Sequence, residues 1–197
     1  MLNVLVARHG QSEWNAAGRW QGQADPPLSD LGRVQASGAA GRLGTFDAII
    51  ASDLDRALTT AMIIADRLGI GPVLVEPAFR ERHAGEYQGL TRHEIEERFP
   101  GHLDAGVWPP GWEPDAQVHA RVDNALDRVR FEIDTGDVLI ISHGGVIYSL
   151  EGHHGAPHDR IANLGARWFH HDGGNWRLGD RVQLSPDDVT IENQDIL

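Results

Sequence analysis

Short apolar runs alternate with amphipathic segments along most of this chain, and this alternation constrains the fold more than any other feature. The runs lie at residues 2–7, 46–51, 73–75 and 137–142. A parallel strand that is covered on both faces has such a continuous apolar sequence, whereas a half-exposed strand alternates apolar and polar residues. Strands that alternate with helices form a sheet with helices on both faces. We therefore predict a three-layer α/β/α sandwich with a mostly parallel central sheet.

The helices between these strands are predicted from capping residues and from the spacing of apolar residues. They are expected at residues 29–43, 54–68, 91–99 and 116–131, with a further helix after the two glycines that follow His143. Gly44 and Gly69 are the expected ends of the first two helices, because glycine commonly follows the last turn. Thr91 and Glu94 have the spacing of a capping box, which predicts the start of the third helix.

Loops and edge strands account for the rest of the chain. Loops are expected at residues 10–29 and 101–114. Residues 166–169 and 176–178 are predicted as edge strands, joined by a turn at residues 172–175. The tail, residues 185–197, is acidic and is expected to be poorly ordered. We predict a single domain over residues 1–197, because this length suits one core and the sequence has no repeat or linker.

The charge of the chain limits what it binds. The formal net charge is −12, which argues against nucleic acid or an anionic membrane as partner. All 17 basic residues are arginine, so arginine, histidine, backbone N–H groups or a metal must bind any anion. The absence of cysteine excludes disulfides and thiolate nucleophiles. No apolar run reaches the roughly 20 residues that cross a bilayer, and no signal peptide is evident, so the cytoplasm is the expected location.

Two histidines occupy equivalent places in the predicted sheet. Arg8 and His9 follow the first strand, His143 follows the strand at residues 137–142, and a glycine stands after each histidine. Glycine lets backbone N–H groups approach an anion closely. Ligands of open α/β sheets bind beyond the carboxyl ends of the strands. We therefore expect both imidazoles and the Arg8 guanidinium in one site, although either histidine alone would more readily be a turn residue.

Arg56 is a further candidate for the same site. It lies on the first turn of the helix that follows the second strand, close to that strand's carboxyl end. Together with Arg8 it would bind a phosphate through bidentate hydrogen bonds. The alternative is a surface ion pair with Asp53 or Asp55.

Five segments share the pattern of one known enzyme family. They are residues 5–15 (LVARHGQSEWN), 19–22 with 27–32 (RWQG and PLSDLG), 52–61 (SDLDRALTTA), 79–90 (FRERHAGEYQGL) and 140–145 (IISHGG). In this order they resemble the histidine phosphatase superfamily, which includes phosphoglycerate mutase. The resemblance covers most of the first 150 residues. It implies a phosphoglycerate mutase-like fold, a small-molecule phosphomonoester as substrate, and no cofactor.

The resemblance also implies roles for individual residues. His9 matches the nucleophile that becomes phosphohistidine, Glu81 matches the proton donor, and three residues surround the phosphoryl oxygens, namely Arg8, Arg56 and His143. The positions that match phosphate- or substrate-binding residues are Asn15, Gln21, Gly22, Arg82 and Gly144, with capping, turn or backbone roles as the alternative for the first three. These roles suit the chemistry, because a histidine nucleophile must be neutral and nearby guanidinium groups lower its pKa. Fixed positive charge also stabilises a transferring phosphoryl group.

Departures from the family pattern favour hydrolysis over a mutase reaction. Ala84 stands where the mutases have a tyrosine, loop 101–114 is short, and the mutases' substrate-contacting lysine is missing. Gly144 stands where some relatives carry an acidic residue, so the proton-donor role falls to Glu81, with a surface ion pair as its alternative. We predict a small bacterial phosphatase that acts on sugar phosphates or phosphoglycerate-type esters. A cofactor-dependent phosphoglycerate mutase reaction is the alternative.

The loops around the predicted site contain further departures. Trp112-Glu113-Pro114 replaces the Gly-Glu-Ser that is common in the family, which keeps the glutamate but removes a hydroxyl and a backbone N–H. Four tryptophans lie in or near these loops and are candidates for a lid over the leaving group, with core packing as the alternative: Trp14, Trp20, Trp108 and Trp112.

Two functions outside the family are also compatible with parts of the sequence. The chain has 11 histidines, which include His153, His154, His158, His170 and His171, and this cluster suggests a metal-dependent hydrolase. Its spacing matches no zinc pattern, so solvated or edge-facing histidines are the preferred interpretation, and no metal is expected. A binding module that has lost catalysis is a third reading. A homodimer through an edge strand or an exposed helix also stays open.

Overall fold

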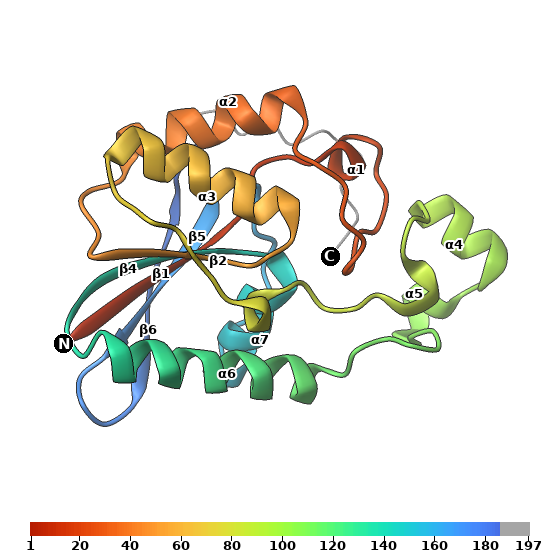
Figure 1. The fold of residues 1–197 in the computed structure, drawn as a ribbon. Helices are drawn as coiled ribbons and strands as arrows, with labels where there is room; N and C mark the ends of the chain where they lie inside the picture. The colour runs from red at the N-terminus through yellow and green to blue at the C-terminus, as the bar shows by residue number, and fades with distance from the viewer. Residues whose placement is uncertain (186–197) are drawn as a thin grey trace.

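The computed structural model describes residues 1–185 and contains a six-stranded sheet with helices on both faces (Figure 1). The strands are β1 (Leu2–Arg8), β2 (Ala48–Ala51), β3 (Leu74–Val75), β4 (Gly136–Ser142), β5 (Gly165–His171) and β6 (Trp176–Gln183). Their order in the sheet is β3-β2-β4-β1-β5-β6. β1 to β4 pair in parallel, whereas β5 is antiparallel to both of its neighbours. The predicted α/β fold with a mostly parallel sheet is confirmed.

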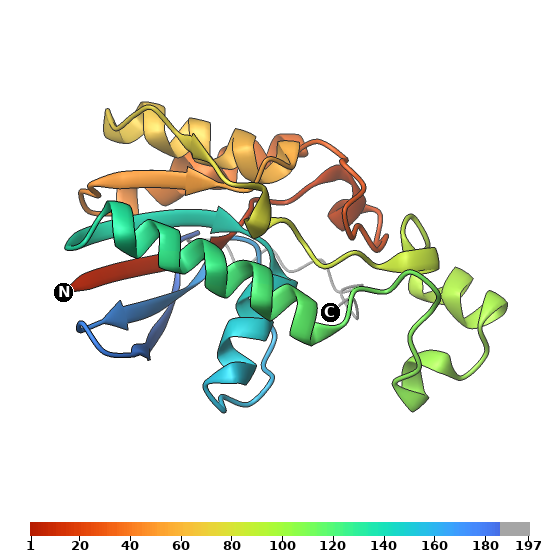
Figure 2. The same ribbon diagram turned by 60° about the horizontal axis from the view of Figure 1, so that its bottom comes forward.

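Four helices form the two outer layers. α2 (Asp30–Ala39) and α3 (Asp55–Leu68) cover one face, and α6 (Asp115–Glu132) and α7 (Gly144–His153) cover the other (Figures 1 and 2). Alternate residues of β1 enter the two cores, as the period of two in a strand requires. Leu5 and Ala7 pack with α2 and α3, while Val4 and Val6 pack with α6 and α7. Burial on both faces therefore explains the continuous apolar sequence of this strand.

The pairing of β1 with β4 brings two strand ends to the same level. The two strands are parallel and in register, with Arg8 opposite Ser142. The backbone N–H of His9 donates to Ser142 O at 3.0 Å, which extends the pairing one residue beyond the strand. His9 and His143 therefore leave the sheet side by side. On the other side of β4, the N–H of Ser52 donates to Ile141 O at 3.0 Å, so the end of β2 lies at this edge too.

Shorter helices lie beyond the carboxyl ends of the parallel strands (Figure 1). They are α1 (Glu13–Ala16), α4 (Arg92–Arg98) and α5 (His102–Ala105), with the 3-10 turns η2 (Pro77–Phe79) and η3 (Gly85–Tyr87). The capping box of Thr91 and Glu94 forms as predicted at the start of α4. A separate apolar cluster, which includes Trp20, Tyr87 and Ile95, holds this part together.

Several local predictions were wrong. The helix predicted over residues 29–43 ends at Ala39 and continues as the 3-10 turn η1 (Ala40–Arg42), so Gly44 does not end it. The predicted loop 101–114 contains the single-turn helix α5, which has too few residues to show a periodic pattern. Left-handed glycines on both sides, Gly101 with φ +74° and Gly106 with φ +63°, permit this turn.

The position of β5 also differs from the prediction. Residues 166–169 were expected to form an edge strand, but β5 lies between β1 and β6, and β6 is the edge. Its mixed sequence hides this position, because polar residues such as His170 find partners at the sheet: the Nδ1 atom of His170 lies 2.7 Å from Asn3 Oδ1. The tail was predicted to be poorly ordered, but the residues beyond 185 lie outside the described part of the chain. Within residues 1–185, the helices are too short or too polar for any of them to span a bilayer.

The loop after β1 packs directly against the first turn of α2. A Cβ atom on Gly32 would lie 2.0 Å from Gln11 O, and one on Gly10 would lie 2.6 Å from Gly32 O. The N–H of Gln11 also donates to Gln35 Oε1 at 2.8 Å. Two backbones thus approach each other too closely for any side chain at these glycines, which ties the loop that follows His9 to α2.

Two glycines of α2 provide a matched test of this packing. We expect Gly32→Ala to lower the free energy of unfolding by about 1–3 kcal/mol, because the methyl group would overlap backbone atoms. A Cβ on Gly38 would meet no atom within 4 Å, so Gly38→Ala should raise the stability by roughly 0.5–1 kcal/mol through helix propensity alone. Urea unfolding of the two variants measures both values. A Gly32→Ala variant as stable as Gly38→Ala would contradict the close approach.

Candidate active site

His9 and His143 form a buried pair where β1 and β4 end. The centroids of their rings are 5.2 Å apart, and the ring planes are inclined by 62°. The exposed fraction is 2% for His9 and 0% for His143. Both residues come from the predicted strand–histidine–glycine units, and the in-register pairing of the two strands accounts for their proximity. The structure thus brings together the two imidazoles that the sequence placed in one site.

The hydrogen bonds of His9 define its protonation. Its Nδ1 atom lies 2.6 Å from the carbonyl oxygen of Gly10. A carbonyl oxygen can only accept, so Nδ1 carries the proton and the ring is held in one orientation. The Nε2 atom accepts from Arg56 Nε at 3.2 Å, so Nε2 has a lone pair and no proton. A neutral imidazole with an unprotonated Nε2 is the form that can attack an electrophile.

Arg56 is a fully buried cation next to His9. Its Nη1 donates to Ala24 O and its Nη2 donates to Gly22 O, both at 2.8 Å. Its exposed fraction is 0%, and burial lowers its pKa to about 10. The side chain therefore keeps its charge at neutral pH while fixed in position. The predicted alternative, a surface ion pair with Asp53 or Asp55, is wrong, because Asp53 pairs with Arg80 instead.

The second arginine, Arg8, is buried at the end of β1, directly before His9. Its Nη1 donates to Ile161 O at 2.7 Å. Burial, together with the positive charges of Arg56 and Arg8, holds the pKa of His9 well below the ordinary histidine value. Burial and the same two cations, with a contribution from Arg121, lower the pKa of His143 in the same way. Both imidazoles are therefore neutral at pH 7, and the positive charge of the site resides on the arginines.

His143 has one ring nitrogen in use and one without a partner. Its Nε2 lies 3.0 Å from Ser52 Oγ, at the end of β2. Its Nδ1 is buried and has no hydrogen-bond partner among residues 1–185. Buried polar atoms in proteins are nearly always paired, so an unpaired one at this edge of the sheet is a place where a ligand oxygen is expected.

Glu81 approaches this group of residues from the loop after η2. Its Oε1 accepts from the backbone N–H of Arg82 at 2.6 Å, and its Oε2 accepts from the N–H of Gly145 at 3.2 Å. A Cβ on Gly145 would lie 2.2 Å from Glu81 Oε1, so a side chain at this position on α7 would displace the Glu81 carboxylate. The alternative for Glu81, a surface ion pair, is wrong: Arg80 pairs with Asp53 and Arg82 with Asp115.

A cavity of about 60 Å³ opens beside these residues. Its lining includes Arg8, Asn15, Gln21, Gly22, Glu81 and Arg82. These are six of the ten residues that the sequence assigned to the site. Three of the others, His9, Arg56 and His143, are buried and do not line it, and Gly144 begins α7, directly before the lining residue Gly145.

Three of the predicted phosphate-binding residues hold the loop after β1 in shape. Asn15 completes a capping box with Ser12 at the start of α1, and Gln21 Oε1 accepts from Ser12 Oγ at 2.7 Å. Gly22 has φ +51°, and a Cβ there would lie 2.7 Å from the backbone nitrogen of Ala84. The loop-ordering roles that the sequence left open are therefore present in the structure.

A larger recess of about 570 Å³ adjoins the small cavity and shares Arg82, Trp112 and Gly145 with it. Trp108 and Trp112 are stacked there with ring centroids 4.2 Å apart, and Tyr148 also lines the recess. Of the four tryptophans considered as a lid, these two line the recess; Trp20, which is 3% exposed, lines the small cavity and belongs to a core cluster, and the Trp14 ring would lie 3.4 Å from a Cβ on Gly89.

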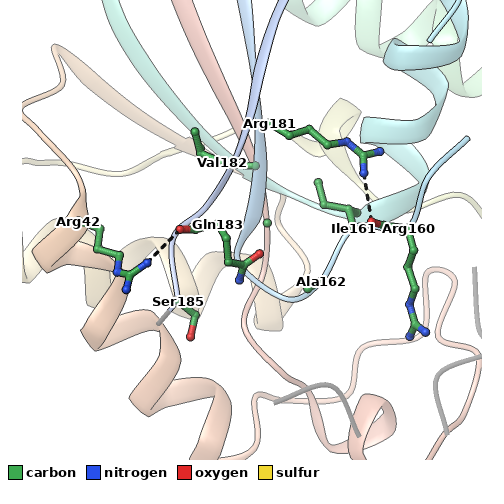
Figure 3. Close-up of a pocket in the computed structure, with 10 residues that line it drawn as sticks. Arg42, Arg160, Ile161, Ala162, Arg181, Val182, Gln183 and Ser185 are labelled. Carbon is green, nitrogen blue, oxygen red and sulfur yellow. Dashed lines mark hydrogen bonds between the residues drawn. The ribbon is translucent and has the colours of Figure 1, made fainter. Parts of the chain in front are cut away.

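Another hollow of about 570 Å³ lies between Arg42 of η1 and the strands β5 and β6 (Figure 3). Three arginines line it: Arg42, Arg160 and Arg181. The Arg181 guanidinium already forms ion pairs with Glu151 and Asp159. None of the residues assigned to the chemistry lines this hollow, so its size does not make it the active site.

Two residues that contact the site were not predicted from the sequence. Asn163 Nδ2 donates to His9 O at 3.0 Å, and Thr60 Oγ1 accepts from the N–H of Gly10 at 3.1 Å. Asn163 stands in a stretch without a recognisable pattern and Thr60 in the middle of a helix, so neither carries a local signal. A spacing argument from Arg56 to Thr60, one helical turn apart, could have found the latter.

The histidines that suggested a metal site do not form one group: His153, His154 and His171 line a hollow together with His119, whereas His158 lines the recess of Trp112 and His170 contacts Asn3. His153 stacks on His119, His158 lies against Tyr148, and His171 lies against Trp176. Over the described range 1–185, no three histidine or carboxylate side chains lie close enough together to hold a metal ion.

Comparison with known proteins agrees with this geometry. The model of the histidine phosphatase superfamily (branch 1) matches residues 4–180. The chain belongs to this superfamily. It is a phosphomonoester hydrolase of the histidine phosphatase type, and the predicted family and enzyme class are confirmed.

Individual relatives support the same family. The glucosyl-3-phosphoglycerate phosphatase of Mycolicibacterium vanbaalenii is 40% identical over 163 residues, which cover 75% of this chain and 71% of that protein. The metal-independent phosphoserine phosphatase of Arabidopsis thaliana is 35% identical over 160 residues, which cover 76% and 67%. A solved structure of a mycobacterial glucosyl-3-phosphoglycerate phosphatase in complex with VO3 has a TM-score of 0.80 at 32% identity, and the match covers 89% of this chain and 96% of that one. This likeness confirms the phosphoglycerate mutase-like fold.

The buried histidines make the stability of this histidine phosphatase depend on pH. In the unfolded chain a histidine titrates near its ordinary pKa of about 6.5, whereas folding lowers the pKa of His143. Below about pH 6.5 the unfolded state therefore binds more protons than the folded state. The free energy of unfolding decreases as the pH is lowered, by up to about 1.4 kcal/mol per pH unit for this group. We expect His143→Gln to remove this share of the slope in urea unfolding between about pH 6.5 and pH 5.

The control for this experiment is His93→Gln. His93 is on the surface of α4, where its side chain is 82% exposed, so its substitution should leave the slope of stability against pH unchanged. A His143→Gln variant with the same slope as the wild type would show that His143 is not held neutral by the fold.

Proposed function

We propose that the protein hydrolyses phosphomonoesters through a phosphohistidine on His9. The observation that carries the proposal is the fixed neutral tautomer of His9, with Nδ1 bonded to Gly10 O and the lone pair of Nε2 free of a proton. Arg8 and Arg56 keep their positive charge beside it. An electron pair for attack and fixed cations for the phosphoryl oxygens are the two requirements of phosphoryl transfer to a histidine.

The proposed reaction has two steps. In the first, His9 Nε2 attacks phosphorus, the P–O bond to the leaving group breaks, and Glu81 in its protonated form gives its proton to the leaving oxygen. In the second, the Glu81 carboxylate accepts a proton from water as the water oxygen attacks phosphorus, and the P–N bond breaks to free His9. Glu81 is thereby protonated again, and inorganic phosphate is released. General acid help of this kind is typically worth about 10²–10⁴-fold.

The charges of the site suit the transferring group. The phosphoryl group develops negative charge on its equatorial oxygens, and preorganised cations stabilise that charge without reorganisation. Arg8 and Arg56 are each fixed by backbone carbonyls, and the buried Nδ1 of His143 has no partner among the described residues. We assign these three side chains to the phosphoryl oxygens.

Water is the proposed acceptor of the phosphoryl group. Ala84, which lines the cavity, offers no hydroxyl or charge to a returning substrate, and the chain has no lysine. The relatives named glucosyl-3-phosphoglycerate phosphatase and phosphoserine phosphatase support hydrolysis as well. A mutase-type transfer is the alternative, since a protein called phosphoglycerate mutase-like protein 4 of Arabidopsis thaliana is 36% identical over 158 residues.

The leaving group is proposed to be a sugar- or glycerate-type alcohol. From the cavity beside His9, a substrate would pass Arg82 and enter the recess of about 570 Å³ that Trp112 and Tyr148 line. Apolar faces of sugar rings pack on such flat aromatic walls, and Arg82, 5.5 Å from the centre of the Trp112 ring, places positive charge near a carboxylate. A phosphorylated glycerate that carries a sugar fits both features, so glucosyl-3-phosphoglycerate belongs to the proposed substrates.

A phosphomonoester panel tests both parts of the proposal. We expect release of inorganic phosphate without a bisphosphoglycerate primer, and a higher kcat/KM for the sugar-bearing ester than for glycerol phosphate, because only the former reaches the recess. His9→Ala should lower kcat by about 10⁴-fold or more, since the nucleophile is removed. His93→Ala, which changes an exposed histidine, should have no effect.

For each part of the proposal, one result of this panel would contradict it. A reaction that requires the primer and isomerises the substrate would show a mutase. Equal kcat/KM values for the large and small esters would overturn the leaving-group assignment, and a fully active His9→Ala variant would overturn the nucleophile.

A further inference from the structure

The loop that carries Glu81 is held by side chains. Four consecutive carbonyl oxygens, those of residues 78–81, each accept a hydrogen bond from a side chain. Three of the four are bound by Arg121 of α6. Its Nη1 donates to Ala78 O at 2.6 Å and to Arg80 O at 2.7 Å, and its Nη2 donates to Glu81 O at 3.1 Å. One side chain of a regular helix thus shapes the backbone of an irregular loop.

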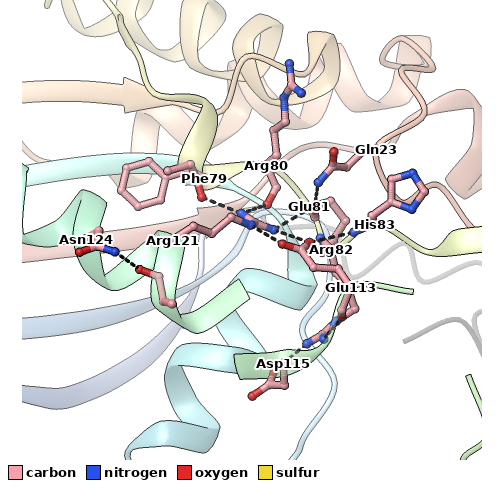
Figure 4. A network of polar contacts seen from close by, with 12 residues as sticks. Gln23, Phe79, Arg80, Glu81, Arg82, His83, Glu113, Asp115, Arg121 and Asn124 are labelled. Carbon is pink, nitrogen blue, oxygen red and sulfur yellow. Dashed lines mark hydrogen bonds and ion pairs between the residues drawn. The ribbon is translucent and has the colours of Figure 1, made fainter. Parts of the chain in front are cut away.

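The remaining donors of Arg121 orient the side chain itself. Its Nε donates to Glu113 Oε1 at 2.7 Å, and Nη2 donates to Oε2 of the same carboxylate at 2.9 Å (Figure 4). A guanidinium has five N–H donors in a rigid plane, and here all five have an acceptor. The side chains of Arg121 and Glu113 are only 22% and 13% exposed, so solvent screens this ion pair far less than a surface pair.

Glu113 links the same loop to the wall of the recess. Its Oε2 accepts from the N–H of His83 at 3.0 Å, its own N–H donates to His83 O at 2.9 Å, and its carbonyl accepts from Arg82 Nη1 at 2.8 Å. Trp112, the residue before it, lines the recess. The Arg121–Glu113 pair therefore fixes the loop of Glu81 and the segment before α6 relative to each other.

The carboxylate of Glu81 depends on this support. Within residues 1–185 it accepts two hydrogen bonds, from the backbone N–H groups of Arg82 and Gly145. A shift of the loop would move the carboxylate away from α7 and from the leaving oxygen. Misplacement of a catalytic group by about 1 Å can cost roughly 10²-fold in rate.

We propose that Arg121, held in place by Glu113, is a positioning residue that sets Glu81 for proton transfer to the leaving group. The inference rests on the proposed function, because it takes Glu81 as the acid. It also explains why Glu113 is kept in Trp112-Glu113-Pro114 although both of its neighbours differ from the family pattern: its carboxylate and both of its backbone polar groups bond to Arg121, His83 or Arg82.

Arg121→Lys is the variant that isolates this role. Lysine keeps the positive charge, which matters because the charge of Arg121 contributes to the lowered pKa of His143. A single ammonium cannot reproduce a planar fork with five acceptors, so the loop loses its support. The matched control is Arg130→Lys on the same helix, where Arg130 forms an exposed pair with Asp127 at 3.3 Å.

The readout is the dependence of kcat/KM on the leaving group. Nitrophenyl phosphate has a leaving group that departs without a proton, whereas an alkyl phosphate needs the acid. We expect Arg121→Lys to lower kcat/KM for the alkyl ester by about 10- to 100-fold, and that for nitrophenyl phosphate by less than about 3-fold. Glu81→Gln should give the same pattern, the double variant should add little to Glu81→Gln alone, and Arg130→Lys should match the wild type.

Several outcomes would overturn the inference. Equal losses for both esters in Arg121→Lys, or full additivity with Glu81→Gln, would mean that Arg121 is only structural. If Arg121→Lys has a much lower melting temperature than the wild type, Glu113→Gln is measured in its place and the same two criteria apply. If Glu81→Gln itself lowers kcat/KM equally for both esters, the acid assignment of the proposed function fails. If Glu81→Gln is selective and Arg121→Lys is not, the inference about Arg121 alone fails.

Discussion

Much of the active site is organised around one buried charge, the guanidinium of Arg56. An ion that is taken out of water without partners costs several kcal/mol, so a fully buried arginine requires acceptors from the fold. The loop after β1 supplies the carbonyl oxygens of Gly22 and Ala24, and His9 supplies its Nε2. Folding of that loop and orientation of the imidazole are therefore consequences of the same burial. The low pKa of His9 has two related causes, the burial of the imidazole itself and the positive charge of Arg56 next to it.

The positive charge at the site contrasts with the acidity of the chain. With a net charge of −12, the protein has no general attraction for an anionic substrate, and phosphate binding has to depend on local, fixed cations. Pairing of β1 with β4 supplies Arg8 and both histidines from adjacent strand ends, and α3 adds Arg56. Because each arginine is held by backbone carbonyls, little reorganisation is needed when charge develops on the phosphoryl group.

The parts of the site that the sequence predicted are those with local signals. Apolar runs and glycines after His9 and His143 predicted the strands and their common edge, and the resemblance added Glu81. Contacts that depend on tertiary packing were not predictable. Arg121 is one charged residue on an amphipathic helix, and its five acceptors come from segments that lie 8 to 43 residues away in the chain. Asn163 likewise reaches His9 across 154 positions.

The wrong predictions for α5 and β5 have the same explanation. Helix α5 is a single turn between two left-handed glycines, and periodicity cannot detect so short a helix. The interior position of β5 depends on which strands pair, and the mixed polar and apolar sequence of that strand gave no sign of a neighbour on both sides. Local pattern thus indicates which elements form, whereas the sheet order and the polar contacts of loops are decided by the complete chain.

Whether His9 carries the phosphoryl group can be measured directly. The enzyme would be mixed with excess substrate, quenched within milliseconds in alkali, in which phosphohistidine survives, and digested for mass spectrometry of the peptide that contains residues 8–10. We expect a phosphate on His9 that is lost after mild acid treatment, in amounts that approach one per active site when phosphorylation is faster than hydrolysis of the intermediate. Phosphate on another residue, or rapid turnover that never yields a phosphorylated peptide even with the Glu81→Gln variant, would contradict it.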